Sequence, residues 1–229
     1  NNDLFKVFDY CKEKDILPLC TPFDLESLLQ LESYGMPAYK VASADLTNHI
    51  LLKEMCKTGK PLICSTGMAT ESEISASVEL LKKNGANFAL LHCNSTYPAP
   101  FKDINLSYLS QLKKIGGNCP IGYSGHERGV SVPVAAVSLG ARIIEKHFTL
   151  DKSMEGNDHK VSLLPQEFKN MVNYIREVEL AMGNNELRTI SQGEMMNREV
   201  LAKSLIANKS IKKGEVILNE YIEIRSPGN

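Results

Sequence analysis

Short apolar runs recur along the chain, separated by segments with helical spacing, and this alternation restricts the possible folds more than any other feature of the sequence. The runs cover residues 16–20, 38–42, 61–65, 88–93, 120–123 and 141–145. Each run has the length of a buried strand. Strands that alternate with helices predict a parallel sheet built from successive βα units.

Helix caps support the same interpretation. Asp24 precedes one helical pattern and has Ser27 three residues later, where a backbone N–H needs an acceptor. Thr70 precedes another helical pattern, and Glu73 stands three residues later, which matches a capping box. Both patterns therefore predict a helix that begins soon after a strand ends.

The six runs predict six strands, whereas a closed (β/α)₈ barrel has eight. Residues 1–14 have the pattern of the helix that would follow a second strand. The sequence therefore predicts an α/β fold, a (β/α)₈ TIM barrel that lacks its first two strands. An open sheet of six strands is the alternative.

The pattern changes after the predicted barrel domain, residues 1–183. Residues 184–203 are predicted as a linker. Strand-like runs at 204–208 and 211–217, joined by a glycine turn, predict a β-rich module over 204–229. A module of this size is too short for a core of its own, so the chain is expected to be cut at its C-terminal end. With its first two strands missing, it is expected to be cut at the N-terminal end as well.

Composition excludes several kinds of partner. The 229 residues include 26 Lys and Arg against 27 Asp and Glu, a net charge of −1, which gives no field for nucleic acid or an anionic membrane. No apolar stretch approaches the roughly 20 residues that span a bilayer. Six single cysteines without a CxxC motif indicate free thiols and a cytoplasmic location.

Two histidines stand where apolar runs end, His126 after residues 120–123 and His147 after residues 141–145. Neighbouring strands lie about 5 Å apart, so both imidazoles can reach one mouth and share a metal ion. Imidazole suits Mn, Fe, Zn or Ni, and two ligands leave positions open for water, a carboxylate or substrate. Two structural histidines, each bonded to its surroundings, are the alternative.

The other predicted strand ends are rich in hydroxyl groups. The hydroxyl-bearing residues at these strand ends are Thr21, Ser43, Ser65, Ser95 and Ser124. Lys40 lies within the second run, and a buried lysine needs a partner or a cavity. Hydroxyls with an ammonium group suit a ligand that carries a phosphate and a carboxylate. Each serine could instead cap a helix.

Six longer motifs follow one another in a recognisable register. They are TPF at 21–23, AYKVAS at 38–43, LICSTGM at 62–68, LLHCNSTYP at 90–98, IGYSGHE at 121–127 and EKHFTLD at 145–151. With these motifs the chain resembles the sialic acid synthase family, which includes N-acetylneuraminate, legionaminic acid and pseudaminic acid synthases. The resemblance extends over essentially the whole chain.

The resemblance implies a TIM barrel followed by a small SAF (antifreeze-like) domain, in a homodimer formed by domain swapping. It implies a transferase of the EC 2.5.1 type, in sialic acid biosynthesis. The substrates would be phosphoenolpyruvate and N-acetylmannosamine or a related N-acylated amino sugar, and phosphate would be released. The implied cofactor is a divalent metal ion, Mn²⁺ in the first place, with Mg²⁺ or Co²⁺ as alternatives.

The resemblance also implies roles for individual residues. Those that match phosphoenolpyruvate contacts are Thr21, Lys40, Ser43, Ser65, Ser95 and Ser124. His126 and His147 match the metal ligands and, with Lys40, the catalytic residues. Tyr97 and Asp158 match positions that contact the sugar.

The family pattern includes a glutamate on the first strand and a phosphate-binding lysine on the second, and the sequence contains neither strand. We therefore expect the purified chain alone to be inactive or nearly so, and detectable turnover would contradict this. One alternative function is a Schiff-base aldolase with Lys40 or Lys146 as nucleophile. Another is a non-catalytic remnant that binds phosphoenolpyruvate or metal without turnover.

Overall fold

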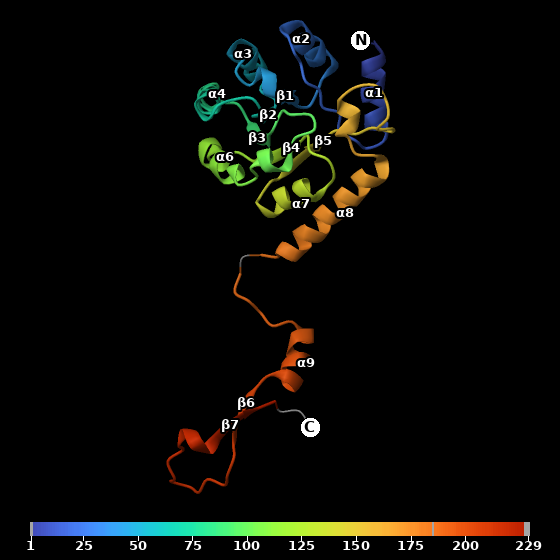
Figure 1. The fold of residues 1–229 in the computed structure, drawn as a ribbon. Helices are drawn as coiled ribbons and strands as arrows, with labels where there is room; N and C mark the ends of the chain where they lie inside the picture. Colours follow the sequence, from blue (N-terminus) through green and yellow to red (C-terminus); the bar gives the residue numbers. More distant parts are fainter. Residues whose placement is uncertain (1, 185, 227–229) are drawn as a thin grey trace. The chain divides into compact units, whose positions relative to one another are not determined.

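A parallel sheet of five strands lies at the centre of the first part of the chain (Figure 1). This computed structural model describes residues 2–184 and 186–226. The strands, which neighbour one another in chain order, are β1 Tyr39–Val41, β2 Leu62–Ser65, β3 Phe88–Cys93, β4 Ile121–Gly125 and β5 Ile143–Lys146. All four pairings are parallel, so the carboxyl ends of the five strands meet at one edge.

Helices connect the strands and surround the curved sheet (Figure 1). They are α1 Asn2–Glu13, α2 Leu25–Tyr34, α3 His49–Lys57, α4 Glu71–Lys83, α5 Phe101–Ile104, α6 Tyr108–Gly116, α7 Ser131–Ser138 and α8 Pro165–Met182, with short 3₁₀ turns η1 Ser43–Asp45 and η2 Asp158–Lys160. Strand and helix alternate from β1 to α8. This confirms an α/β architecture of the TIM-barrel type, while the two absent strands stay a prediction.

The helix caps predicted from the sequence are present. The Asp24 carboxylate accepts a hydrogen bond from the Ser27 backbone N–H at 2.6 Å, at the start of α2. Thr70 and Glu73 form both bonds of the capping box at the start of α4. These caps fix where each helix begins, and the cap of α4 also fixes the length of the loop that follows β2.

The run at residues 16–20, predicted as a strand, does not form one. Only Cys20 pairs with the sheet, through an isolated parallel bridge to Tyr39. Pro18 has no N–H to donate to a ladder, and Leu17 is 67% exposed. Within the described residues the sheet therefore has five strands in place of the six predicted.

The core fills the space between the sheet and its helices. Leu62 and Leu90 on the strands and Leu81 and Leu112 on the helices are completely buried in it. Burial of side chains such as these is the main favourable term in folding. On both faces β3 and β4 are buried, as the central strands of a parallel sheet are expected to be.

Gly122 lets β4 fit between its two neighbours. A Cβ atom at this position would lie 2.4 Å from the Leu91 Cδ2 atom and 2.5 Å from the Ile143 backbone oxygen. Both distances are far below van der Waals contact, and a backbone oxygen within a sheet cannot easily move. Glycine is therefore required here by the packing of three adjacent strands.

The second unit, which begins at Asn184, contains one helix and a two-stranded antiparallel sheet. The helix is α9 Gln192–Leu201, and the strands are β6 Ser204–Ala207 and β7 Ile222–Arg225, preceded by η3 Asn219–Tyr221. Its described residues are all exposed or half-buried. Nowhere in the described parts of the chain is a helix both long enough and apolar enough to cross a membrane.

Two sequence-based assignments in this unit differ from the structure. The predicted linker, residues 184–203, includes α9, which starts with a capping box between Ser191 and Glu194. The predicted glycine turn is present at Gly214, whose φ is +89°, but residues 211–217 around it form no strand. Residues 222–225 pair with β6 in their place.

We expect the substitution Gly122→Ala to lower the free energy of unfolding by about 1–3 kcal/mol, because its methyl group overpacks the junction of three strands. Urea denaturation followed by circular dichroism measures the change. Gly193→Ala in α9 is the matched control, since no atom lies within 4 Å of its added Cβ. Equal effects of the two substitutions would contradict the packing argument.

Candidate functional site

A pocket opens at the carboxyl ends of the strands, with a volume of about 370 Å³, which is within the range of small-molecule sites. Nine of the residues predicted for the site line it. They are Thr21, Lys40, Ser43, Ser65, Ser95, Tyr97, Ser124, His126 and His147. Asp158 is the one predicted site residue that does not. The structure thus brings together side chains from every strand of the sheet, and their roles stay predictions.

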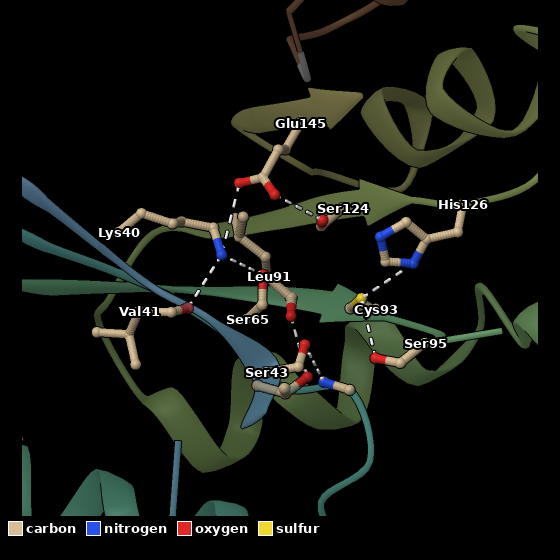
Figure 2. Close-up of polar contacts among 12 residues, drawn as sticks. Lys40, Val41, Ser43, Ser65, Leu91, Cys93, Ser95, Ser124, His126 and Glu145 are labelled. Carbon is tan, nitrogen blue, oxygen red and sulfur yellow. Dashed lines mark hydrogen bonds and ion pairs between the residues drawn. The ribbon is translucent and has the colours of Figure 1, made fainter. Parts of the chain in front are cut away.

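Lys40 is held in the pocket by several acceptors. Its ammonium group donates to the Ser65 hydroxyl at 2.8 Å and to the Val41 backbone oxygen at 3.0 Å (Figure 2). It lies 3.6 Å from the Glu145 carboxylate, and only 14% of the lysine side chain is exposed. The positive charge is therefore fixed in position and only partly balanced, which suits an anionic ligand.

Glu145 joins the two sides of the pocket. Besides its ion pair with Lys40, it accepts a hydrogen bond from the Ser124 hydroxyl at 3.0 Å (Figure 2). Ser124 and Glu145 are register partners on β4 and β5, so the bond follows from the parallel pairing. The carboxylate is nearly half exposed, which leaves oxygen lone pairs available to the pocket.

Gly67 allows two hydroxyl groups to converge at the base of the pocket. Its backbone N–H donates to the Ser43 hydroxyl at 3.1 Å. A Cβ atom at residue 67 would lie 2.2 Å from the Ser95 Oγ and 2.8 Å from the Ser43 Oγ. The loop after β2 can therefore approach these hydroxyls only because residue 67 has no side chain.

The two histidines lie side by side, His126 directly after β4 and His147 directly after β5, with ring centroids 5.1 Å apart. The His126 Nδ1 lies 2.6 Å from the Asn94 backbone oxygen, which can only accept. Nδ1 therefore carries the proton, and Nε2 keeps its lone pair. The Tyr97 ring contacts both imidazoles, with centroids at 4.0 Å and 5.7 Å.

The ionisation of the two histidines favours metal binding at His147. Burial and the neighbouring His126 lower the pKa of His147, so its imidazole is neutral near pH 7. For His126, burial opposes the charged form, but contacts with Cys93 and the Asn94 carbonyl outweigh it and the pKa is raised. A bound cation would compete with a proton at the His126 Nε2.

These residues fit part of a divalent metal site. Neutral imidazoles from adjacent strands are common metal ligands, and a carbonyl that fixes the second nitrogen is the usual outer-shell partner. Among the described residues no group of three or more His, Cys, Asp or Glu side chains has the arrangement of a complete metal site. An ion held by His126 and His147 would therefore take its remaining ligands from water or substrate.

Comparison with known proteins identifies the family of this chain. The NeuB family model matches residues 1–187. The chain belongs to the NeuB family. N,N'-diacetyllegionaminic acid synthase of Campylobacter jejuni is 44% identical over 223 residues, which cover 96% of this chain and 66% of that protein. An uncharacterized protein of Methanocaldococcus jannaschii is 44% identical over 230 residues, or 99% and 67% of the two chains.

A solved structure supports the same relationship. The crystal structure of the N-acetylneuraminic acid synthetase from Leptospira borgpetersenii matches with a TM-score of 0.80 and 36% identity, over 87% of this chain and 70% of that chain. The NeuB chain described here spans about two thirds of the length of the curated relatives above. The resemblance to the sialic acid synthase family is thus confirmed at the level of the family.

Asp158 lies apart from the other predicted site residues of this NeuB chain. It stands in η2, on the loop after β5, and 67% of its side chain is exposed. Its carboxylate is 3.9 Å from the His147 Nδ1. The structure therefore places Asp158 beside one histidine at the outer side of the mouth, and its contact with a sugar stays a prediction.

Two ionisable residues that line the pocket were not among the sequence-based candidates. Glu145 and Cys93 both line the pocket. A charged residue at the end of an apolar run, directly before Lys146 and His147, was a usable signal for Glu145. Cys93 gave no such signal, because a cysteine at the end of an apolar run is usually core, and its place follows from the register of β3 with β4.

We expect iodoacetamide to label Cys93 faster than Cys64 at neutral pH, because the thiolate is the reactive form. Burial opposes ionisation of Cys93, but the nearby His126 Nδ1, 3.7 Å from its sulfur, lowers the pKa overall. Burial raises the pKa of Cys64 to about 12. His126→Ala should move Cys93 labelling to higher pH, as followed by peptide mass spectrometry.

Cys119 provides the reference in the same experiment. Burial raises its pKa, and it is half-buried outside the pocket. Its labelling should have the same pH dependence in the wild-type chain and in His126→Ala. A Cys93 profile that is identical in the two proteins would contradict the role assigned to His126.

Proposed function

We propose that this chain forms part of a nonulosonic acid synthase, which condenses phosphoenolpyruvate with N-acetylmannosamine or a related N-acylated amino sugar and releases phosphate. The observation that carries the proposal is the arrangement of one pocket. Lys40 and several hydroxyls line one side, and His126 and His147 line the other. The synthases named among its relatives support the same class of reaction.

The lysine side of the pocket suits the anionic substrate. Phosphoenolpyruvate carries a phosphate and a carboxylate, which need several donors in fixed positions. The Lys40 ammonium and the hydroxyls of Ser43, Ser65, Ser95 and Ser124 provide them. Because hydrogen bonds already hold Lys40 and Ser43, these donors reorganise little when charge develops, which lowers the barrier of the chemical step.

The histidine side suits the aldehyde of the open-chain sugar. A divalent ion bound by His126 and His147, for which we propose Mn²⁺ with Mg²⁺ or Co²⁺ as alternatives, supplies Lewis acidity toward the aldehyde oxygen. The half-exposed Tyr97 ring forms a wall beside the imidazoles, against which an apolar sugar face can pack. Asp158, at the outer side of the mouth, would accept hydrogen bonds from sugar hydroxyls.

The proposed reaction forms one carbon–carbon bond and one carbon–oxygen bond to water, and it breaks the carbon–oxygen bond to phosphate. The enol carbon of phosphoenolpyruvate attacks the aldehyde carbon, whose oxygen takes a proton. Water then adds to the phosphate-bearing carbon and loses a proton, and phosphate leaves from the tetrahedral intermediate. Glu145, which accepts from Ser124 and faces Lys40, is a carboxylate within the pocket that can receive a proton during these steps.

The Schiff-base aldolase is less consistent with the geometry. A nucleophilic lysine must reach the substrate with an unprotonated amine. The Lys146 side chain is completely buried and bonded to Glu127, so no substrate can reach it. Lys40 donates to two acceptors and faces a carboxylate, which are contacts of an ammonium group.

Two experiments separate these functions. Calorimetry of the chain with phosphoenolpyruvate, with and without Mn²⁺, should show binding that Mn²⁺ strengthens, and an assay of phosphate release should be sensitive to EDTA in any preparation that turns over. Borohydride treatment with pyruvate should leave the mass of the chain unchanged. A covalent adduct would favour the aldolase. Binding without phosphate release in a chain extended at its N-terminus by the two predicted strands would favour a non-catalytic role.

We also propose that the second unit is an SAF-like module that functions in a homodimer. Its apolar side chains support this, since Leu205, Val216 and Ile224 are each at least two thirds exposed. A unit whose described residues bury no side chain of their own needs another surface to cover them.

We expect Lys40→Met to weaken phosphoenolpyruvate binding about 10- to 100-fold, because a hydrogen-bonded charge is worth roughly 1.5–3 kcal/mol. Calorimetry measures the change. Lys60→Met is the matched control, since Lys60 forms a 2.6 Å ion pair with Glu32 outside the pocket. Unchanged affinity in Lys40→Met, or an equal loss in the control, would contradict the proposed binding mode.

A further inference from the structure

A buried ion pair joins the ends of β4 and β5 next to the two histidines. The Lys146 Nζ lies 2.7 Å from the Glu127 Oε1, and both side chains are completely excluded from solvent. Lys146 also donates to the backbone oxygen of Glu127. Glu127 directly follows His126, and Lys146 directly precedes His147. Each partner of the pair is therefore one residue from a proposed metal ligand.

A tyrosine and a glycine complete the surroundings of this pair. The buried Tyr123 hydroxyl donates to the second carboxylate oxygen, Glu127 Oε2, at 2.5 Å. A Cβ atom at Gly125 would lie 2.7 Å from the Glu127 Oε2 and 2.7 Å from the Tyr123 ring. The carboxylate can fold back against its own strand only because residue 125 lacks a side chain. Both oxygens of Glu127 thus have defined partners.

The pair lies behind the pocket, away from the ligand. Successive side chains of a strand point to opposite faces, so Lys146 points away from the face on which Glu145 and His147 line the pocket. Neither Glu127 nor Lys146 lines that pocket. The pair therefore does not contact a ligand in the pocket. Any effect of the pair on ligand binding must act through the histidines.

Stability alone is a weak explanation for a pair of this kind. Removing two charges from water is costly, and well-packed apolar side chains often serve a core as well or better. A buried pair does provide a fixed geometry, because either partner left alone would be an uncompensated charge. Here that geometry sets the distance between the ends of the two strands that carry the histidines.

We propose that Glu127 and Lys146, with Tyr123, are positioning residues that hold His126 and His147 at the separation required to bind one metal ion. The metal ion in this inference rests on the proposed function. The placement of the two imidazole rings does not depend on that function. Loss of the carboxylate would free β4 and β5 to shift, and both imidazoles would change their surroundings with or without an ion.

The molecule contains a second group with the same three residue types, which offers a matched control. Glu32 accepts from the Tyr39 hydroxyl and from the Lys60 ammonium, the latter at 2.6 Å. Tyr39 begins β1 and Lys60 precedes β2, so this group lies at the amino ends of the strands, opposite the pocket. It has the same chemistry without a histidine neighbour.

The test compares Glu127→Gln with Glu32→Gln. Both substitutions remove a carboxylate charge from a Tyr–Glu–Lys group, and both should lower the midpoint of thermal unfolding. Only Glu127→Gln should weaken Mn²⁺ binding, by about 10- to 100-fold, as loss of an outer-shell partner typically does. Paramagnetic resonance of free Mn²⁺ measures the affinity. The Glu32 variant should stay within twofold of the wild-type chain.

A readout without metal keeps the two proposals distinguishable. In the metal-free chain, Glu127→Gln should shift the ring proton resonances of both His126 and His147, whereas Glu32→Gln should shift neither. If the wild-type chain binds no Mn²⁺, the proposed metal site is wrong, and these resonances alone decide the positioning role. Unshifted histidine resonances with wild-type Mn²⁺ affinity would overturn it.

A milder variant covers the case in which Glu127→Gln does not fold. Tyr123→Phe keeps the ion pair and removes one hydrogen bond to the Glu127 carboxylate. It should shift the same histidine resonances and weaken Mn²⁺ binding about two- to fivefold, less than an outer-shell carboxylate does. A folded Tyr123→Phe chain with unchanged resonances and unchanged affinity would contradict the proposal.

Discussion

Parallel pairing of the strands determines everything that the pocket contains. Because all five strands run in one direction, their carboxyl ends meet at one edge, and side chains far apart in sequence become neighbours. Lys40 and Glu145, on the first and last strands of the sheet, lie 3.6 Å apart because the sheet also curves and brings its two edge strands toward each other. The curvature of the sheet is visible in Figure 1, and the pocket lies at that edge. The arrangement of the pocket side chains therefore depends on the backbone hydrogen bonds between the strands.

The pocket concentrates polar groups without leaving them unpaired. No buried side-chain nitrogen or oxygen among the described residues lacks a hydrogen-bond partner. Lys40, Ser65, Ser124 and Glu145 form one connected network, shown in Figure 2. A satisfied network is rigid, and rigid dipoles stabilise developing charge without first having to turn. The Lys146–Glu127 pair behind the strands adds the same kind of constraint to the histidines.

The sequence predicted the elements whose signals are local and periodic. Strand runs, the caps and the polar strand ends depend on spacing along the chain, and the structure has them where they were predicted. The failures arose where another signal prevailed, such as Pro18 within an apolar run or the Ser191 cap that starts a helix within the predicted linker. The pairing of Glu145 with Lys40 depends on the order and register of the strands, which spacing alone does not define. The burial of Lys146 with Glu127 depends on them too.

Gly67 has a consequence for how this pocket could diversify. The Ser43 and Ser95 hydroxyls line the pocket and occupy the space where a side chain at residue 67 would stand. Substitution of residue 67 therefore cannot change the pocket gradually, because even a methyl group there would displace the Ser43 and Ser95 hydroxyls. A change of ligand preference can come more easily from exposed lining residues such as Phe23 and Met68, whose side chains have no proposed role. Substitution is thus restricted at Gly67 and less restricted where the lining residues are exposed.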